Sequence, residues 1–218
     1  MVVKGLGLGW LVVVMLLSGC ASNGPQLPGL ADRVELSSVP FFRGNAHQSA
    51  PMVLASVLSM QGVNISPGLV ETALDVEHPA GLAQSLPEAA RGYGMVAYPL
   101  EPQLNALLAQ VSAGYPVVVR YTEGSLVWSE PRYALLVGYD RYKERVLLRS
   151  GMQRRKVMSF SSFTSAWQDA GSWALLVQRP EQLPAKVDPQ RWRSAAQALA
   201  RSGQEPAATR AIKALEQR

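Results

Sequence analysis

The spacing of apolar residues changes near residue 115, from a helical period to the short apolar runs of strands. In the first half, apolar side chains recur three or four residues apart, which is typical of helices with one buried face. Pro87 is a candidate interruption of one of these helices, because proline removes a helical N–H. The pattern predicts helices over 49–61, 66–74, 82–93 and 103–113, with a short strand over 95–98.

The second half is rich in β-branched and aromatic residues between polar turns. The runs 117–119 and 134–137 are wholly apolar, which indicates central strands covered on both faces. A polar turn is expected over 140–144 and a short helix over 161–169. Because helices precede strands, the predicted fold class is α+β. Strands are predicted over 116–121, 133–139, 146–149, 156–158 and 173–178.

The C-terminal segment returns to a helical period. Prolines before it predict a linker over 181–189. The segment 190–218 contains two amphipathic helices separated at Ser202-Gly203, and this hairpin resembles one tetratricopeptide repeat. A single repeat buries its apolar face poorly. The hairpin is therefore expected to pack on the main domain, pair with a second copy or clasp a partner; a simple stabilising tail is the alternative.

The first twenty residues carry a targeting pattern. Lys4 precedes 13 consecutive glycine and apolar residues, Gly5 to Leu17. This run is too short for a membrane-spanning helix, which needs ~20 residues, but it suits a signal peptide. The sequence Leu17-Ser18-Gly19-Cys20 that follows resembles the lipobox of bacterial lipoproteins.

That resemblance implies cleavage before Cys20, a diacylglycerol thioether on its sulfur and an acyl chain such as palmitate on the new amine. It predicts a signal peptide over 1–19 and a tether over 20–38. Ala21, where an aspartate is absent, resembles lipoproteins sorted to the outer membrane. The expected location is the cell envelope, on the outer membrane facing the periplasm. The alternative is a free cysteine behind an ordinary cleaved signal.

The amino-acid composition argues against several classes of function. The 218 residues carry a formal charge of +5, but no dense basic run predicts nucleic-acid binding. A single cysteine excludes an intramolecular disulfide, a Cys-x-x-Cys redox pair and a cysteine-rich zinc site. The two histidines, His47 and His78, leave little for a metal centre. The sequence predicts neither a metal nor another cofactor.

The region 39–180 resembles a papain-like cysteine peptidase domain of the bacteriocin-processing (double-glycine leader) type. More narrowly, the whole chain is similar to envelope lipoproteins that join such a domain to tetratricopeptide repeats. The order and spacing of several short segments carry the resemblance: Val39-Pro40-Phe41-Phe42, Gln48-Ser49-Ala50-Pro51, Pro116-Val117-Val118-Val119, Arg132 to Asp140, and Leu147 to Gly151.

The resemblance implies a nucleophilic cysteine opening a long helix, a histidine base on a central strand and a glutamine that holds the oxyanion. Here the three positions hold Ser49, Tyr133 and Gly44. The third member of the triad, usually an acid, falls at Ser150-Gly151. A serine needs a base, and tyrosine, with a pKa of ~10, is a poor one. No catalytic residue is therefore expected.

Other polar residues near these segments have plain interpretations. Ser49 is a good helix N-cap, and Asp140 is expected in a turn. His47 lies two residues before Ser49 and is a poor candidate for its base, and His78, beside Pro79, is expected in an exposed loop.

Three functions follow from the sequence. The first is a catalytically silent, lipid-anchored module that binds a peptide or an envelope protein in a groove between helices and sheet. The second is a hydrolase that uses Ser49, and the third is an assembly element that acts through the C-terminal hairpin. Candidates to line the groove of the first are the aromatic residues Trp128, Tyr133, Tyr139 and Trp173.

Overall fold

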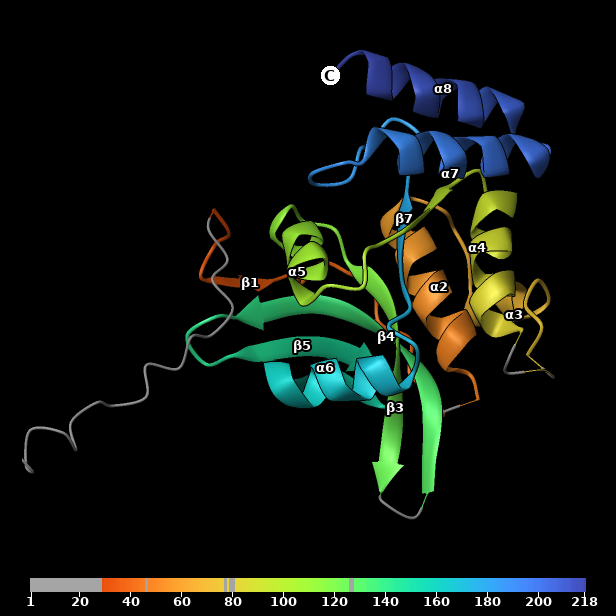
Figure 1. Cartoon of the computed structure of the whole chain (residues 1–218). Coiled ribbons are helices and arrows are strands. Elements are labelled where there is room, and N and C mark those ends of the chain that lie inside the picture. The colour runs from red at the N-terminus through yellow and green to blue at the C-terminus, as the bar shows by residue number, and fades with distance from the viewer. Residues whose placement is uncertain (1–28, 46, 77, 79–80, 126–127) are drawn as a thin grey trace, which may run out of the picture.

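A computed structural model describes residues 29–45, 47–76, 78, 81–125 and 128–218 (Figure 1). The predicted signal peptide, Cys20 and residues 20–28 of the predicted tether lie outside these residues. Within the described part, no helix is both long enough and apolar enough to span a membrane.

A seven-stranded antiparallel sheet forms the centre of the molecule. Six strands follow the order β2-β7-β3-β4-β5-β6, and β1 pairs with the end of β4 that β3 leaves free. The strands are β1 (Arg33–Glu35), β2 (Val96–Pro99), β3 (Val117–Ser125), β4 (Trp128–Asp140), β5 (Arg145–Ser150), β6 (Gln153–Ser159) and β7 (Ala174–Gln178).

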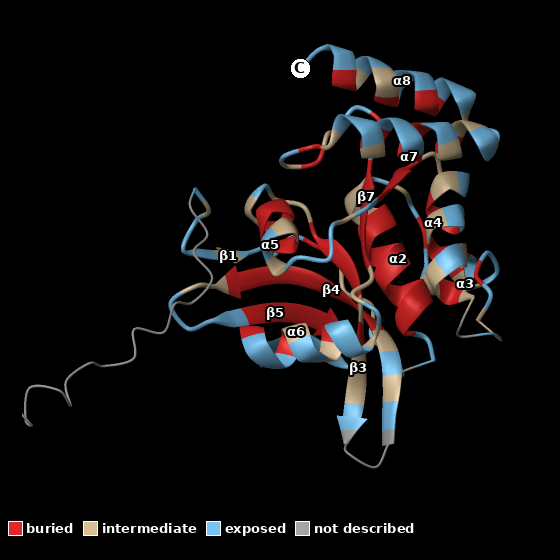
Figure 2. Ribbon diagram, viewed as in Figure 1, coloured by how far each residue is buried: buried red, intermediate tan, exposed pale blue. Residues whose placement is uncertain are grey.

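Helices cover both faces of this sheet, which confirms the α+β class. One face packs against α2 (Ser49–Met60), α3 (Pro67–Glu71) and α4 (Leu82–Gly92), and it forms a core with Val118 and Leu135 of the central strands. The other face is covered by α5 (Leu104–Ser112), α6 (Phe160–Asp169) and α7 (Pro189–Arg201), and α8 (Glu205–Glu216) packs on the outside of α7 (Figure 1). Figure 2 shows how deeply α2 and the central strands are buried between these layers.

The predicted elements differ from the observed ones mainly at their ends. Pro87 does not interrupt α4, which runs through it. The helix expected over 66–74 ends at Glu71. The strands β3 and β4 extend as a paired ribbon well past the predicted 121 and 133, because each polar residue there finds a backbone partner on the other strand.

The segment expected to be tether over 20–38 contributes β1, which the sequence pattern did not predict. Val34 pairs with Tyr139, and the neighbouring Gly138 allows this approach. A Cβ on Gly138 would lie 2.5 Å from the carbonyl oxygen of Val34. The Arg149 guanidinium, itself buried, donates to the carbonyls of Leu36 and Ser37 at 3.1 Å. Residues 33–37 are therefore part of the domain.

The C-terminal hairpin packs on the main domain, which was one of the alternatives that the sequence left open. The Trp192 side chain is fully buried, its ring lies 5.9 Å from that of Tyr98, and its indole N–H donates to the Ala211 carbonyl. The linker is fixed as well, because Gln110 bonds both the N–H and the C=O of Ala185. The hairpin and the sheet share one core.

Candidate functional site

The site positions implied by the resemblance meet where α2 approaches β4. The start of α2 is preceded by a turn in which the Asn45 side-chain oxygen accepts the Gln48 N–H at 3.1 Å. Gln48 is the N-cap residue, and Ser49 is the first residue of the helix. The prediction that Ser49 is the N-cap is therefore wrong. Its side chain is 5% exposed and faces the sheet.

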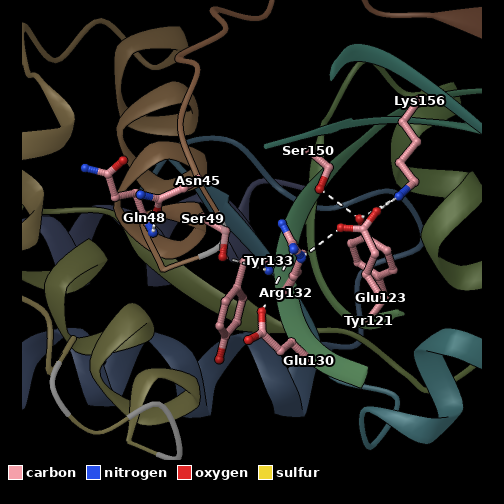
Figure 3. A network of polar contacts seen from close by, with 10 residues as sticks. All are labelled: Asn45, Gln48, Ser49, Tyr121, Glu123, Glu130, Arg132, Tyr133, Ser150 and Lys156. Atoms are coloured by element: carbon pink, nitrogen blue, oxygen red, sulfur yellow. Dashed lines mark hydrogen bonds and ion pairs between the residues drawn. The ribbon is translucent and has the colours of Figure 1, made fainter. Parts of the chain in front are cut away.

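A hydrogen bond between Ser49 and Tyr133 joins the two halves of the site. The Ser49 hydroxyl oxygen accepts the backbone N–H of Tyr133 at 3.2 Å, across 84 residues of sequence (Figure 3). The structure thus brings together the positions that the resemblance assigns to nucleophile and base. The contact is made with the strand's backbone, however, and not with the side chain of Tyr133.

Tyr133 fills the space where a base would stand. It is 2% exposed, and its ring packs edge-on against Trp173 with centroids 5.5 Å apart. Its hydroxyl has no hydrogen-bond partner among the described residues. Burial raises the pKa of this phenol to about 12. Tyr133 is therefore protonated at neutral pH and cannot take a proton from Ser49.

The oxyanion position lacks a side-chain donor. Gly44 lies against the Met52 thioether, and a Cβ on Gly44 would come within 2.5 Å of its sulfur. The Gly44 backbone N–H points to the Gly151 carbonyl at 3.5 Å. Gly44 has no side chain that could donate to an oxyanion, and a longer residue at this position would need Met52 to move.

The position of the third triad member faces the other side of the sheet. The Ser150 hydroxyl is 2.8 Å from the Tyr121 hydroxyl, and Lys156 donates to the same phenol at 3.3 Å. Lys156 also forms an ion pair with Glu123. Tyr121 belongs to the core opposite the one that holds Tyr133. Ser150 therefore cannot orient a group at position 133.

Arg132 belongs to this second network. It lies next to Tyr133 in β4 and points to the opposite side of the strand, because side chains alternate (Figure 3). Its Nε lies 2.8 Å from a Glu123 oxygen, and Glu130 lies at 3.9 Å. These partners neutralise its charge, so this side of the sheet holds a closed ion-pair network.

The structure separates the predicted groove residues. Tyr133 and Trp173 lie together, with Trp173 partly exposed. Tyr139 lies on the opposite face and donates to the Ala31 carbonyl at 2.9 Å. A bulge between Leu136 and Gly138 shifts the alternation of β4 and turns Tyr139 to that face. Trp128 begins β4, and its side chain lies outside the described residues.

The remaining polar candidates do not join the site. Asp140 is the last residue of β4 and not part of the turn itself, but its side chain accepts the Lys143 N–H at 3.0 Å and so stabilises the turn that follows. His78 is exposed and bonds Asp75. His47 is exposed in the turn before α2. Among the residues that the structure describes, no three metal-ligating side chains gather.

One residue of the site was missed by the sequence analysis. Arg120 is paired with Tyr133 in the β3–β4 register. It lies two residues after Val118, whose side chain packs in the α2 core, so both point to the same face. An arginine that follows a run of three valines is the signal that could have identified it.

Comparison with solved structures assigns the architecture. The chain resembles a C39-like peptidase from Bacillus anthracis, with a TM-score of 0.53 and 18% identity over 67% of this chain and 98% of that one. It also resembles the peptidase domain of Streptococcus ComA, a bifunctional ABC transporter involved in quorum sensing. There the TM-score is 0.50 at 19% identity, covering 63% of this chain and 96% of that one. No protein-family model and no curated protein matches the sequence.

The fold is therefore that of the C39-like peptidase domains, as the sequence resemblance implied. The positions at which that resemblance places its catalytic residues hold Ser49, Tyr133 and Gly44.

Replacement of Ser49 by alanine should destabilise the protein by about 1–3 kcal/mol, because it leaves the buried N–H of Tyr133 without an acceptor. Ser56→Ala is the matched control: Ser56 is equally buried, but it only donates to the Met52 carbonyl of its own helix. Denaturant unfolding measures both changes. A loss of stability no larger in Ser49→Ala than in Ser56→Ala would contradict this role.

Tyr133→Phe tests the buried phenol. Because its pKa is raised from 10.0 to about 12, folding favours the protonated form. The stability from this group is fully present below pH 10 and is lost as the pH rises through about 12. We expect Tyr133→Phe to be at least as stable as the natural protein near neutral pH, since the hydroxyl has no partner.

Between pH 10 and 12, the range between the two pKa values, the natural protein should lose about 2–3 kcal/mol more unfolding free energy than Tyr133→Phe. Unfolding free energies measured across this range, with tyrosinate absorbance followed in parallel, provide the check. Tyr121 remains in the variant as an internal reference. Identical alkaline profiles for the two proteins would refute the assignment.

Proposed function

We propose that this chain is a catalytically silent C39-like module that binds a peptide or an envelope protein and is anchored to the outer membrane through a lipid on Cys20. One observation supports its silence: the Ser49 hydroxyl is buried and accepts the Tyr133 N–H, while the Tyr133 ring stands at the position of the base. The phenol of Tyr133 is protonated at neutral pH, so it does not act as a base toward the Ser49 hydroxyl.

Several retained features support binding. The helix and the strand that frame a peptidase site remain joined by a direct hydrogen bond. Beside them lie the partly exposed Trp173 ring and the Arg120 side chain, both on the face that packs against α2. An aromatic surface with a cationic neighbour is suited to hold a peptide, since aromatic and arginine side chains provide most of the energy of many interfaces.

We expect the purified full chain, in detergent, to leave peptides uncleaved and to resist labelling by a fluorophosphonate probe. The same preparation should retain a discrete envelope protein or peptide from cell extracts, and Trp173→Ala should weaken that capture by about tenfold or more. Leu69→Ala, which removes an exposed side chain on α3, is the matched control. Turnover that disappears in Ser49→Ala would replace this proposal with a serine hydrolase.

Cys20→Ala tests the anchor. The variant should leave the membrane fraction and lose incorporation of labelled palmitate, because the thiol is the attachment point of the lipid. Ser18→Ala, which keeps a small residue within the lipobox, should remain anchored. Fractionation of cells with separation of inner and outer membranes measures both. Persistent membrane association of Cys20→Ala would exclude lipidation at this residue as the anchor.

A further inference from the structure

Arg120 carries a charge that the fold leaves unpaired. It is half-buried, and its Nε is enclosed with no hydrogen-bond partner among the described residues. Within those residues no carboxylate lies within 4.0 Å of its guanidinium. Charged groups withdrawn from water are costly unless they are paired. The terminal nitrogens of the guanidinium are not among the enclosed atoms, so an acceptor oxygen from outside the chain can reach them.

Two other partly buried arginines of the chain are paired with acids, and the more deeply buried Arg149 is held instead by the Leu36 and Ser37 carbonyls. Arg132 lies against Glu123, and Arg191 against Glu101 at 3.0 Å. Each of these charges is matched by an acid of the chain itself. Arg120 lies in the centre of the sheet, on the face that holds the degenerate site, and has no such acid.

A second unmet donor lies beside the first. Tyr133 is directly opposite Arg120 in the register, and its hydroxyl is enclosed without a partner among the described residues. Residues directly opposite each other on paired strands share one face of the sheet, with Cβ atoms about 5 Å apart, so the two groups are neighbours. The Tyr133 hydroxyl is closed to solvent, so its ring acts as a wall beside Arg120. A guanidinium can only donate, so Arg120 is the group that an outside acceptor oxygen would meet.

Trp173 provides an apolar wall at the same place. Its backbone carbonyl accepts the Arg120 N–H at 3.2 Å, and its ring packs edge-on against Tyr133. The three residues come from β3, β4 and the segment before β7, so the sheet holds them in fixed relation. A carboxylate with an apolar neighbour would meet the guanidinium and the indole ring.

We propose that Arg120 and Trp173, with the buried Tyr133 ring packed behind them, form a recognition site for a peptide carboxylate, in which the guanidinium binds the anion and the indole packs against the residue beside it. The inference rests on the proposed binding function and specifies the chemistry of the ligand. The carboxylate comes either from a free C-terminus or from an aspartate or glutamate side chain, and both present the same two acceptor oxygens. Arginine suits this role because its planar fork can bind both oxygens at once.

The test follows the Arg120 Nε–Hε resonance by NMR in the full chain held in detergent micelles. The probes are acetate, N-acetyl-glycylglycine, the C-terminal amide of that dipeptide, and N-acetyl-glutamate amide, each at constant ionic strength set with chloride. Acetate and at least one carboxylate peptide should shift the resonance saturably, while the uncharged amide should not. The dipeptide acid and the glutamate amide distinguish a C-terminus from a side chain.

Variants distinguish specific binding of the carboxylate by Arg120 from nonspecific attraction to the positive charge of the protein. Arg120→Gln should weaken binding of the responding peptide by about 10- to 100-fold, the value of a hydrogen bond to a charged group. Arg120→Lys should recover part of that loss, because it keeps the charge without the fork. Arg193→Gln is the matched control, since it removes one exposed positive charge on α7. It should bind as the natural protein does.

The inference is overturned if chloride alone reproduces the shift, or if Arg120→Gln and Arg193→Gln bind the probe equally. These results would leave the proposed binding function intact, provided that the envelope partner is still captured. Conversely, Ser49-dependent cleavage of a peptide would end the proposal of a silent module, whatever Arg120 binds. The two failures are therefore distinguishable.

Discussion

The hydrogen bond from the Tyr133 N–H to the Ser49 hydroxyl oxygen determines what the site can do. It fixes the first turn of α2 against the central strand β4, which are 84 residues apart in the chain. A hydroxyl that satisfies a buried backbone donor is part of the structure, and displacing it would leave that donor unmet. The contact that joins the two halves of the fold thus also occupies the group that could have served as a nucleophile.

Alternation of side chains across β3 and β4 divides the polar residues into two groups. One face holds a polar network in which each positive charge is paired with a carboxylate; its members are Tyr121, Glu123, Arg132, Ser150 and Lys156. On the other face, Arg120 and Tyr133 lie beside Trp173 with donors unmet within the described residues. The first network stabilises the strand ribbon, while the second has the chemistry of a ligand site.

The two proposals therefore share one physical basis. The proposed lack of catalysis rests on the missing base and oxyanion donor, because a serine hydroxyl does not ionise unaided near neutral pH. Loss of catalysis does not remove the sheet face that the peptidase fold presents. A cation and an aromatic ring on a rigid face can still select a peptide by its charge.

The sequence by itself determined the order of elements and the α+β class, because helical and strand periods are local properties. The resemblance placed Ser49, Tyr133 and Gly44 at the degenerate positions, and the structure brings the Ser49 hydroxyl to the Tyr133 backbone. Only the tertiary structure decided that the Ser49 hydroxyl accepts the backbone N–H of Tyr133, because this contact requires α2 to pack beside β4. It also turned Tyr139 away through a bulge and left Arg120 without an acid, since bulges and pairing across strands are not local to the sequence.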